Sequence, residues 1–337
     1  RVVVVTTLRV GLKMLRCLYR YSTTSVDGRR AGRPLANGWF ACLWSLIGDL
    51  DYFISVLNLP NFSNAGNPCA LCRCSLSGSN SWSDFTPSAA WRNQCWTRAA
   101  WLRWPSRSRC LIFGLVPGLS ALSVHLDYMH NKYLGTDQYA FASVLCLLVF
   151  HIMGGSAAAN LLECHKFIQA WYKENKVPVG VRYKYLNRTT MILKKNGCAK
   201  LRGKASEIRH VVGALHDLWK AKMDAESDVH RQVALLLKMN REMENLITEF
   251  HDEICFPAEA ADRFEAACNA MLVLHGQLAQ YFAEKGLDYF TLTAKSHMLQ
   301  HACILSRCLS PRQAPCCWLV VVLLFCSRKK TLTNSLK

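Results

Sequence analysis

The stretch Trp39-Phe40-Ala41-Cys42-Leu43-Trp44-Ser45-Leu46-Ile47 is a continuous apolar run that stops at Gly48-Asp49. A run of this length that ends at glycine and an acid is typical of a buried strand with a carboxylate at its end. The run Ala121-Leu122-Ser123-Val124-His125-Leu126 repeats the pattern and ends in Asp127. The two stretches predict two strands that place Asp49 and Asp127 in matching positions.

The chain after Gly135 has apolar residues at helical spacing almost to its end. They recur at i, i+3 and i+4, and Gly286 is placed where a helix can end. The predicted helices cover 139–174, 205–223, 227–253, 259–285 and 293–308. A mixed α/β front therefore precedes a helical back.

Composition excludes several classes of protein. With 337 residues, 51% of them hydrophobic, the chain can bury a large core and is neither a disordered tail nor a minimal disulfide scaffold. The 17 cysteines are odd in number and scattered, which favours reduced thiols in an intracellular compartment. The net charge of +18 favours a polyanionic partner, since residues 1–110 hold 14 Lys and Arg against 4 acids. A solvated basic surface or a targeting segment over 1–33 is the alternative.

A cysteine-rich stretch interrupts the front of the chain. Residues 57–81 are rich in Asn, Pro, Gly and Ser and contain Pro68-Cys69-Ala70-Leu71-Cys72-Arg73-Cys74. Cys69 and Cys72 have the spacing of half a structural Zn²⁺ site, which would stabilise a loop that has little secondary structure. The remaining ligands stay open among Cys74, Cys95, His125 and His130, and unliganded buried thiols are an equal alternative.

His297 and His301 are spaced i, i+4, so they can bind a metal or a phosphate from one helix face. An ordinary helix surface is the commoner explanation for such a pair. The stretch 82–104 interleaves Trp and Arg and can either contact nucleic acid or supply core aromatics.

One apolar stretch is long enough to span a bilayer. Residues 139–162 contain no Asp, Glu, Lys or Arg, but His151, Asn160 and the Gly154-Gly155-Ser156 break weaken the case. A membrane anchor over 139–162 is therefore the less favoured alternative.

Three acids form the candidate catalytic constellation. Two carboxylates at strand ends and a third on a helix can hold two divalent ions for attack on a phosphodiester, and oxygen ligands suit Mg²⁺ or Mn²⁺. Glu207 is the third candidate, because Lys204, Glu207 and His210 fall three apart on one predicted helical face. A helix-start charge is the alternative for each acid taken alone.

Several short motifs occur in a characteristic order. They are Gly38-Trp39-Phe40, Gly48-Asp49-Leu50-Asp51-Tyr52-Phe53, Cys69-x2-Cys72, Leu126-Asp127-Tyr128-Met129-His130 with Leu134-Gly135, Lys204-x2-Glu207, and Lys295-Ser296-His297 with His301. In this order they resemble DDE-type DNA transposases of the Plavaka or Kyakuja-Dileera-Zisupton kind, from about Ala31 to Arg312.

The resemblance implies an α/β fold with an RNase H-like core, a large mainly α-helical insertion and a C-terminal helical region. It also implies that Asp49, Asp127 and Glu207 are catalytic and hold Mg²⁺ or Mn²⁺, with Asp51 as the rival for the first position. The implied reaction is cleavage and transfer of DNA strands in the nucleus. The residues implied to contact DNA are His130, Lys204, Lys295 and His297, and a homo-oligomer is one option for the assembly.

The expected organisation has four parts. They are a basic segment over 1–34, an α/β core with the cysteine-rich loop over 35–138, a helical region over 139–310 that carries the third acid, and an apolar-basic tail over 311–337. Disorder is one option for the basic segment. Both ends depart from the pattern of the family and look truncated or replaced. Loss of catalysis is therefore one option. The alternatives are a non-catalytic nucleic-acid-binding protein or, less favoured, a protein anchored by 139–162.

Overall fold

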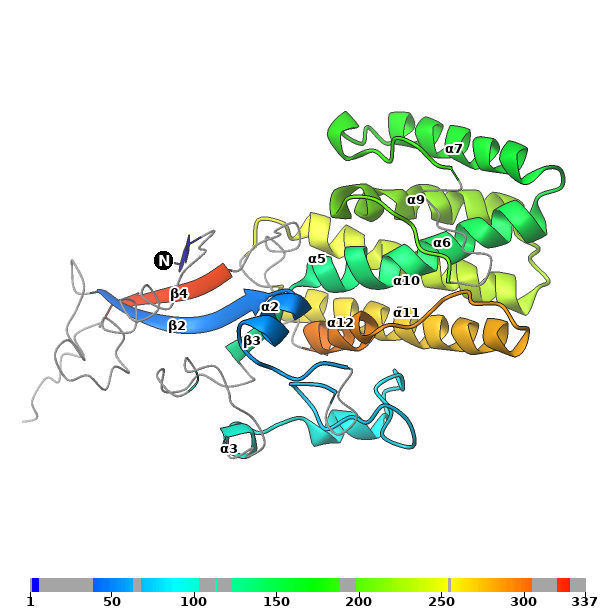
Figure 1. Ribbon diagram of the computed structural model, residues 1–337. Coiled ribbons are helices and arrows are strands. Elements are labelled where there is room, and N and C mark those ends of the chain that lie inside the picture. Colours follow the sequence, from blue (N-terminus) through cyan, green and yellow to red (C-terminus); the bar gives the residue numbers. More distant parts are fainter. Residues whose placement is uncertain are drawn as a thin grey trace, which may run out of the picture. The chain divides into compact units, whose positions relative to one another are not determined.

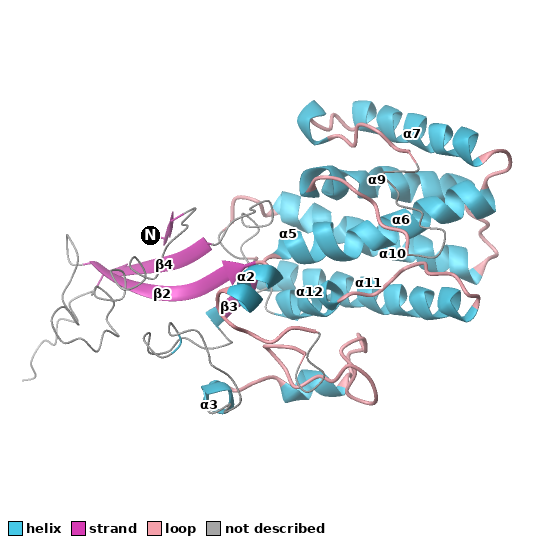
Figure 2. Ribbon diagram, in the orientation of Figure 1, coloured by secondary structure: helices cyan, strands magenta, loops and turns pink. Residues whose placement is uncertain are grey.

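The computed structural model describes residues 2–5, 39–62, 68–102, 113, 123–187, 198–253, 256–304 and 320–327. Contacts divide the chain into two units. The first consists of Arg1–Arg73, Cys95–Leu126 and Trp318–Lys337, and the second of Cys74–Gln94 and Asp127–Cys317. The described residues are mainly helical (Figures 1 and 2).

The first unit contains the strands. They are β1 (Val2–Val5), β2 (Trp39–Gly48), β3 (Val124–Leu126) and β4 (Val320–Ser327), hydrogen-bonded in the order β1-β4-β2-β3. β4 is antiparallel to both β1 and β2, whereas β2 and β3 are parallel, with Gly48 opposite Leu126. Two short helices, α2 (Leu50–Ser55) and α3 (Arg98–Leu102), belong to the same unit. The sequence correctly predicts β2 and the end of β3.

The second unit is a helical assembly. Its elements are η2 (Ala90–Gln94), α5 (Tyr128–Asn131), η4 (Lys132–Thr136), α6 (Asp137–Leu147), η5 (Leu148–Ile152), α7 (Ala157–Glu174), η6 (Val179–Val181), α9 (Ala205–Lys222), α10 (Asp228–Glu249), α11 (Ala258–Glu284) and α12 (Ala294–Ile304). α7 packs on α9, α9 on α10, α10 on α11 and α11 on α12 (Figure 1). These helices confirm the predicted helical back to within a few residues at most ends.

Local sequence sets the helix boundaries. Ser156 precedes α7, and its hydroxyl accepts a hydrogen bond from the Ala159 N–H at 3.2 Å, as a helix N-cap does. Gly155 has a φ of +99° and separates η5 from α7, so the predicted helix over 139–174 is interrupted where its Gly-Gly-Ser sequence indicates. Gly286, with a φ of +71°, follows the end of α11.

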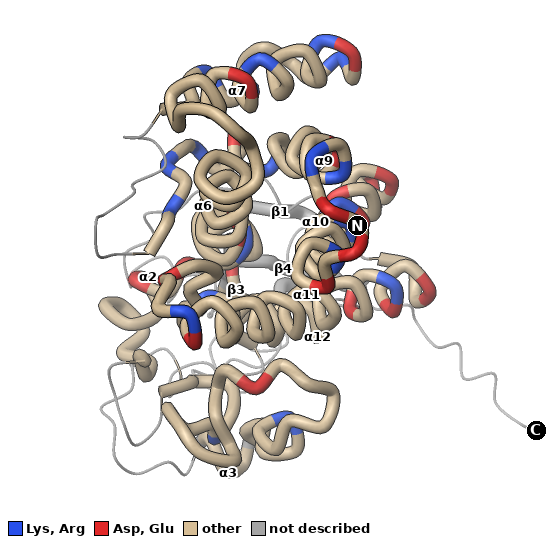
Figure 3. Tube along the Cα trace, turned by 90° about the vertical axis from the view of Figure 1, so that its right-hand side faces the viewer, with Lys and Arg blue, Asp and Glu red and all other residues tan. Residues whose placement is uncertain are grey.

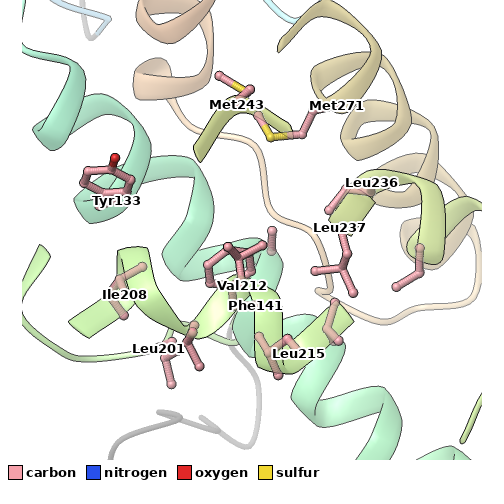
Figure 4. Close-up of a cluster of buried hydrophobic side chains, with 14 of the residues drawn as sticks. Tyr133, Phe141, Leu201, Ile208, Val212, Leu215, Leu236, Leu237, Met243 and Met271 are labelled. Carbon is pink, nitrogen blue, oxygen red and sulfur yellow. The ribbon is translucent and has the colours of Figure 1, made fainter. Parts of the chain in front are cut away.

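The core of the second unit is made from one face of each long helix. Figure 4 shows Phe141, Val212, Leu215 and Leu237 close together in this core. Each of these side chains is almost completely buried. Burial of a side chain of this size contributes about 1.5–3 kcal/mol relative to exposure, so this core is the main source of stability of the unit.

The helical stretch Tyr128–Ile152 is long and apolar enough to cross a membrane by length and composition alone. Within the protein, 83% of its most apolar window is buried. Such a helix is also typical of a protein core, so the observation is weak evidence for a membrane span.

The expected α/β class holds only for the small sheet, and an RNase H-like core is not shown by the described residues. Between β2 and β3 no further strand occurs in the described residues of 49–123, so the alternation of strands and helices that defines an α/β core is missing there. The sheet instead takes β1 and β4 from distant parts of the chain. Most of the predicted segments 1–34 and 311–337 lies outside the described residues.

Candidate metal centre

Four buried side chains form a candidate metal site. Cys69, Cys72, His297 and His301 each offer one ligand atom, and these atoms all lie within 4.8 Å of one another. The two cysteines and His297 have no exposed surface, and His301 is 4% exposed. The site therefore combines a Cys-x2-Cys loop with two histidines one turn apart on α12.

The local backbone holds the cysteine pair in place. The Leu71 N–H donates to Cys69 Sγ at 3.3 Å, which stabilises negative charge on the sulfur. The Trp96 N–H donates to the Leu71 carbonyl oxygen at 2.9 Å, and Cys72 forms a β-bridge with Cys95. A segment with little secondary structure thus presents both sulfur atoms in a fixed geometry.

The histidine pair is oriented by a backbone carbonyl and an aromatic ring. His297 Nδ1 lies 2.9 Å from the Trp82 carbonyl oxygen, which can only accept, so Nδ1 carries the proton and Nε2 keeps its lone pair. His297 Nε2 lies 3.1 Å from His301 Nε2. The Trp91 ring packs against both imidazoles, with centroid distances of 4.6 and 4.9 Å. A carbonyl that fixes the tautomer of a metal-binding histidine is a common feature of metal sites.

The donor set fits Zn²⁺. Zn²⁺ binds Cys sulfur at about 2.3 Å and His nitrogen at about 2.0–2.1 Å, so ligand atoms in a tetrahedral site lie roughly 3.3–3.8 Å apart. The 3.1 Å separation of the two histidine nitrogens and the 4.8 Å limit for the whole set are close to this geometry. Mg²⁺ prefers oxygen ligands, and this cluster offers none.

The structure confirms Cys69 and Cys72 as parts of a cluster that can bind zinc and corrects the expected partners. None of Cys74, Cys95, His125 and His130 belongs to this group. The two histidines are buried, so the expectation of an ordinary helix surface for them is wrong. Their i, i+4 spacing, read together with Cys-x2-Cys, is the sequence signal that could have found the site, although it does not show that the histidines are buried.

Asp49 and Asp127 directly follow paired strand residues. Gly48 and Leu126 are opposite each other at the ends of the parallel strands β2 and β3. Asp49 then caps α2, and its Oδ1 accepts a hydrogen bond from the Tyr52 N–H at 2.7 Å. The rival acid, Asp51, is exposed in the first turn of α2.

Asp127 caps α5 and is almost completely buried. Its carboxylate accepts a hydrogen bond from the His130 N–H at 3.3 Å, and its Oδ2 lies 2.8 Å from His130 Nδ1. His130 is therefore a direct partner of Asp127. The two aspartates share the same setting, a strand end followed by a helix cap.

Glu207 lies in the first turn of α9, where its carboxylate accepts a hydrogen bond from the Lys204 N–H at 2.8 Å. This contact is a helix-start role, the alternative that the sequence leaves open for each acid. The side chain of Lys204 is exposed.

Two of the predicted motifs contact each other. Lys295 Nζ donates to the Leu134 carbonyl oxygen at 2.9 Å, and Thr136 Oγ1 lies 3.3 Å from Ser296 Oγ. A Cβ on Gly135 would lie 2.9 Å from Lys295 side-chain atoms, which explains the glycine. Lys295 is therefore committed to a backbone contact, and His297 is buried in the metal centre.

The aromatic stretch 82–104 supplies core residues where it is described. Trp91, Trp96 and Trp101 are buried. The Arg73 guanidinium lies over the Trp96 ring at 4.4 Å, and Arg92 donates to Asn269 Oδ1 at 2.8 Å. The predicted contacts of Arg103, Arg107 and Arg109 with nucleic acid, and the side chain of Arg98, lie outside the described residues.

A buried charge cluster lies next to the motif that begins at Asp127. Lys132 Nζ lies 2.7 Å from Asp137 Oδ2 and 2.8 Å from both Glu244 Oε1 and Asn240 Oδ1. Glu244 also pairs with Arg209 at 2.8 Å. Burial raises the pKa of Asp137 from its ordinary value near 3.8 to about 6, although Lys132 opposes the shift. The sequence analysis did not predict this cluster. Its sequence signal is the presence of Lys132 and Asp137 within an otherwise apolar helical stretch.

The chain matches none of the family models, curated proteins or solved structures with which it was compared.

Proposed function

We propose that the chain is a transposase-derived protein whose acids Asp49, Asp127 and Glu207 descend from a site for metal-dependent cleavage and transfer of DNA strands. One observation supports the proposal most directly: Asp49 and Asp127 directly follow Gly48 and Leu126, which are paired at the ends of two parallel strands. The carboxyl ends of parallel strands lie at one edge of a sheet. An RNase H-like core built around β2 and β3 is the finer part of the same proposal.

The carboxylates retain capacity for a metal ion. Each carboxylate oxygen has two acceptor sites, so one cap hydrogen bond does not exhaust the acceptor capacity of Asp49 or Asp127. A bound Mg²⁺ or Mn²⁺ would activate the attacking oxygen and stabilise the leaving oxygen. His130 fixes the orientation of the Asp127 carboxylate by its contact with Oδ2.

In this proposal Zn²⁺ has a structural role. The four ligands of the metal centre are buried and closed by protein groups, whereas a catalytic zinc keeps an open position. The ion would stabilise the cysteine-rich loop, which has little secondary structure of its own. We place the protein in the nucleus, with DNA as its partner and a homo-oligomer as a possible assembly.

A second candidate function is non-catalytic DNA binding. It is favoured by a specific observation: in the described structure each of the three acids is used at the start of a helix. The net charge of +18 supports DNA binding in either case.

The test is a plasmid-nicking assay with the purified full chain in Mg²⁺ or Mn²⁺. Asp127→Asn is the informative variant, because asparagine is also a good N-cap and preserves the start of α5 while removing the carboxylate. Asp51→Asn is the matched control at a rival acid. The proposal predicts metal-dependent nicking that Asp127→Asn abolishes and Asp51→Asn leaves unchanged. Salt-sensitive DNA binding without nicking would select the second candidate.

A further inference from the structure

A group of cations without acidic partners lies on one part of the second unit. We define the basic surface as the eight Lys and Arg residues described in 165–187 and 198–204, namely Lys166, Lys173, Lys176, Arg182, Lys184, Lys200, Arg202 and Lys204. Glu174 is the one acid in these ranges; Glu163 and Glu207 lie just outside them, Glu163 paired with Lys222 and Glu207 bonded to the Lys204 N–H. Six of the eight side chains are exposed, and Arg182 and Lys200 are half-buried.

Hydrogen bonds join the three segments that carry the basic surface. Gln169 on α7 donates to the Tyr183 carbonyl oxygen at 2.7 Å, and His165 Nε2 lies 3.0 Å from the Lys184 carbonyl oxygen. The hydroxyl of Tyr183 donates a hydrogen bond to the Arg202 carbonyl oxygen. The segment after α7 therefore lies along α7 and touches the segment before α9, so the cations share one region.

Among the described residues, the basic surface gathers unpaired cations, whereas several cations elsewhere in the unit are paired with carboxylates. None of the eight makes an ion pair with a carboxylate in the described structure. Elsewhere Lys222 pairs with Glu163 at 2.6 Å, Arg241 with Asp217 at 3.0 Å, and Arg231 with Asp228. Figure 3 shows Asp and Glu gathered around α10 and α11, whereas Lys and Arg predominate beside α6.

Uncompensated like charges repel each other and raise the free energy of the folded state unless an anion neutralises them. We propose that the basic surface binds the phosphate backbone of DNA without reading its sequence. Six of the eight cations are lysines, which act as point charges on phosphates, whereas base recognition favours the planar arginine fork. Tyr185, 72% exposed beside Lys184, adds a hydroxyl and a ring at the same place.

The choice of DNA as the polyanion rests on the proposed function, but the surface does not depend on catalysis. The family resemblance implies DNA contacts at His130, Lys204, Lys295 and His297. Of these residues Lys204 is exposed and belongs to the basic surface. The proposed DNA contact therefore keeps Lys204 and extends over α7 and the segments beside it.

The test compares two triple variants that change net charge equally. Lys173→Glu/Lys184→Glu/Lys204→Glu alters the basic surface, and Lys220→Glu/Lys238→Glu/Lys285→Glu alters exposed lysines on α9, on α10 and after α11. Binding of a 30-base-pair duplex is measured by fluorescence anisotropy from 50 to 300 mM salt, and thermal unfolding confirms that both variants fold.

We expect the first triple to reduce affinity at least tenfold at 100 mM salt and to lower the slope of log Kd against log salt by about three, roughly one for each phosphate that is no longer neutralised. The control triple should change affinity less than threefold. Equal decreases in affinity for both triples would overturn the proposal, because overall charge would then explain binding. So would unchanged binding by the first triple, or binding to phosphatidylserine vesicles or duplex RNA in place of DNA.

The nicking assay separates this proposal from the proposed function. DNA binding that depends on the lysines of the first triple but shows no metal-dependent nicking supports the basic surface and contradicts the enzyme. Nicking that depends on Asp127, together with binding that the first triple leaves unchanged, supports the enzyme and contradicts the basic surface.

Discussion

Removal of Lys132 should destabilise the second unit more than removal of any exposed lysine. Lys132 has no exposed surface and contacts Asp137, Glu244 and Asn240 at 2.7–2.8 Å. Two cations, Lys132 and Arg209, balance the two buried carboxylates of the cluster. Lys132→Met fills a similar volume but leaves a carboxylate without its partner.

Breaking a buried ion pair by removing one partner costs about 3–5 kcal/mol. For a unit of this size 1 kcal/mol corresponds to about 2–4 °C in Tm, so we expect a decrease of roughly 6–20 °C. Differential scanning calorimetry measures the change. Lys220→Met is the matched control, because Lys220 is exposed on α9, and it should change Tm by less than about 2 °C.

A double variant tests the reason for the destabilisation. Lys132→Met/Asp137→Asn restores the charge balance between Glu244 and Arg209, so it should be more stable than Lys132→Met alone. Two outcomes would show that the cluster does not act as a charge-balanced unit. Lys132→Met could lower the free energy of unfolding by less than about 1 kcal/mol, or the effects of Lys132→Met and Asp137→Asn could simply add in the double variant.

Three further outcomes follow from the structure. Gly213→Ala should destabilise the protein by about 1–3 kcal/mol, because its Cβ would clash with the Trp171 ring. Gly276→Ala should instead stabilise it by up to about 1 kcal/mol, since the atom nearest to its Cβ is at 3.6 Å; urea unfolding decides between the signs. His301→Ala should abolish the binding of one zinc per chain, measured by elemental analysis, and a chelator should lower Tm in the wild type but not in this variant. Burial raises the pKa of Asp137 to about 6, so between about pH 4 and 6 the folded protein holds a proton that the unfolded chain has lost, and the free energy of unfolding falls as pH rises through this range. Asp137→Asn should remove this pH dependence from urea unfolding, and an unchanged pH dependence would contradict the raised pKa of Asp137.

The sequence is informative where a local pattern decides the structure. Apolar residues at helical spacing predict α9, α10 and α11. Gly286 marks the end of α11, because a residue in the left-handed region of φ and ψ terminates a helix. The run 39–47 predicts β2 because it is continuously apolar and ends at Gly48-Asp49. These features depend on neighbours in the chain, so local patterns are enough to find them.

Features that depend on distant partners are harder to predict. The sequence pattern of a strand does not indicate which other strands it pairs with, so the pairing of β2 with β4 does not follow from the sequence. The first half of the metal site is visible in Cys69 and Cys72, whereas its second half follows more than 200 residues later, and the helix pattern of α12 gives no indication that His297 and His301 are buried. Burial depends on tertiary packing, which no window of sequence contains.

The metal centre and the helical core differ in what stabilises them. α10 and α11 bury apolar side chains such as Leu237 and Met271, and this packing requires no metal. The segment around Cys72 has little secondary structure and is held by a few hydrogen bonds, such as those of the Leu71 and Trp96 N–H groups. Since structural zinc supplies folding energy where a core is missing, removal of the ion should open the cysteine-rich loop while the helices stay folded. A zinc ion bound by this cluster would organise the cysteine-rich loop, whereas the apolar packing of α10 and α11 requires no metal.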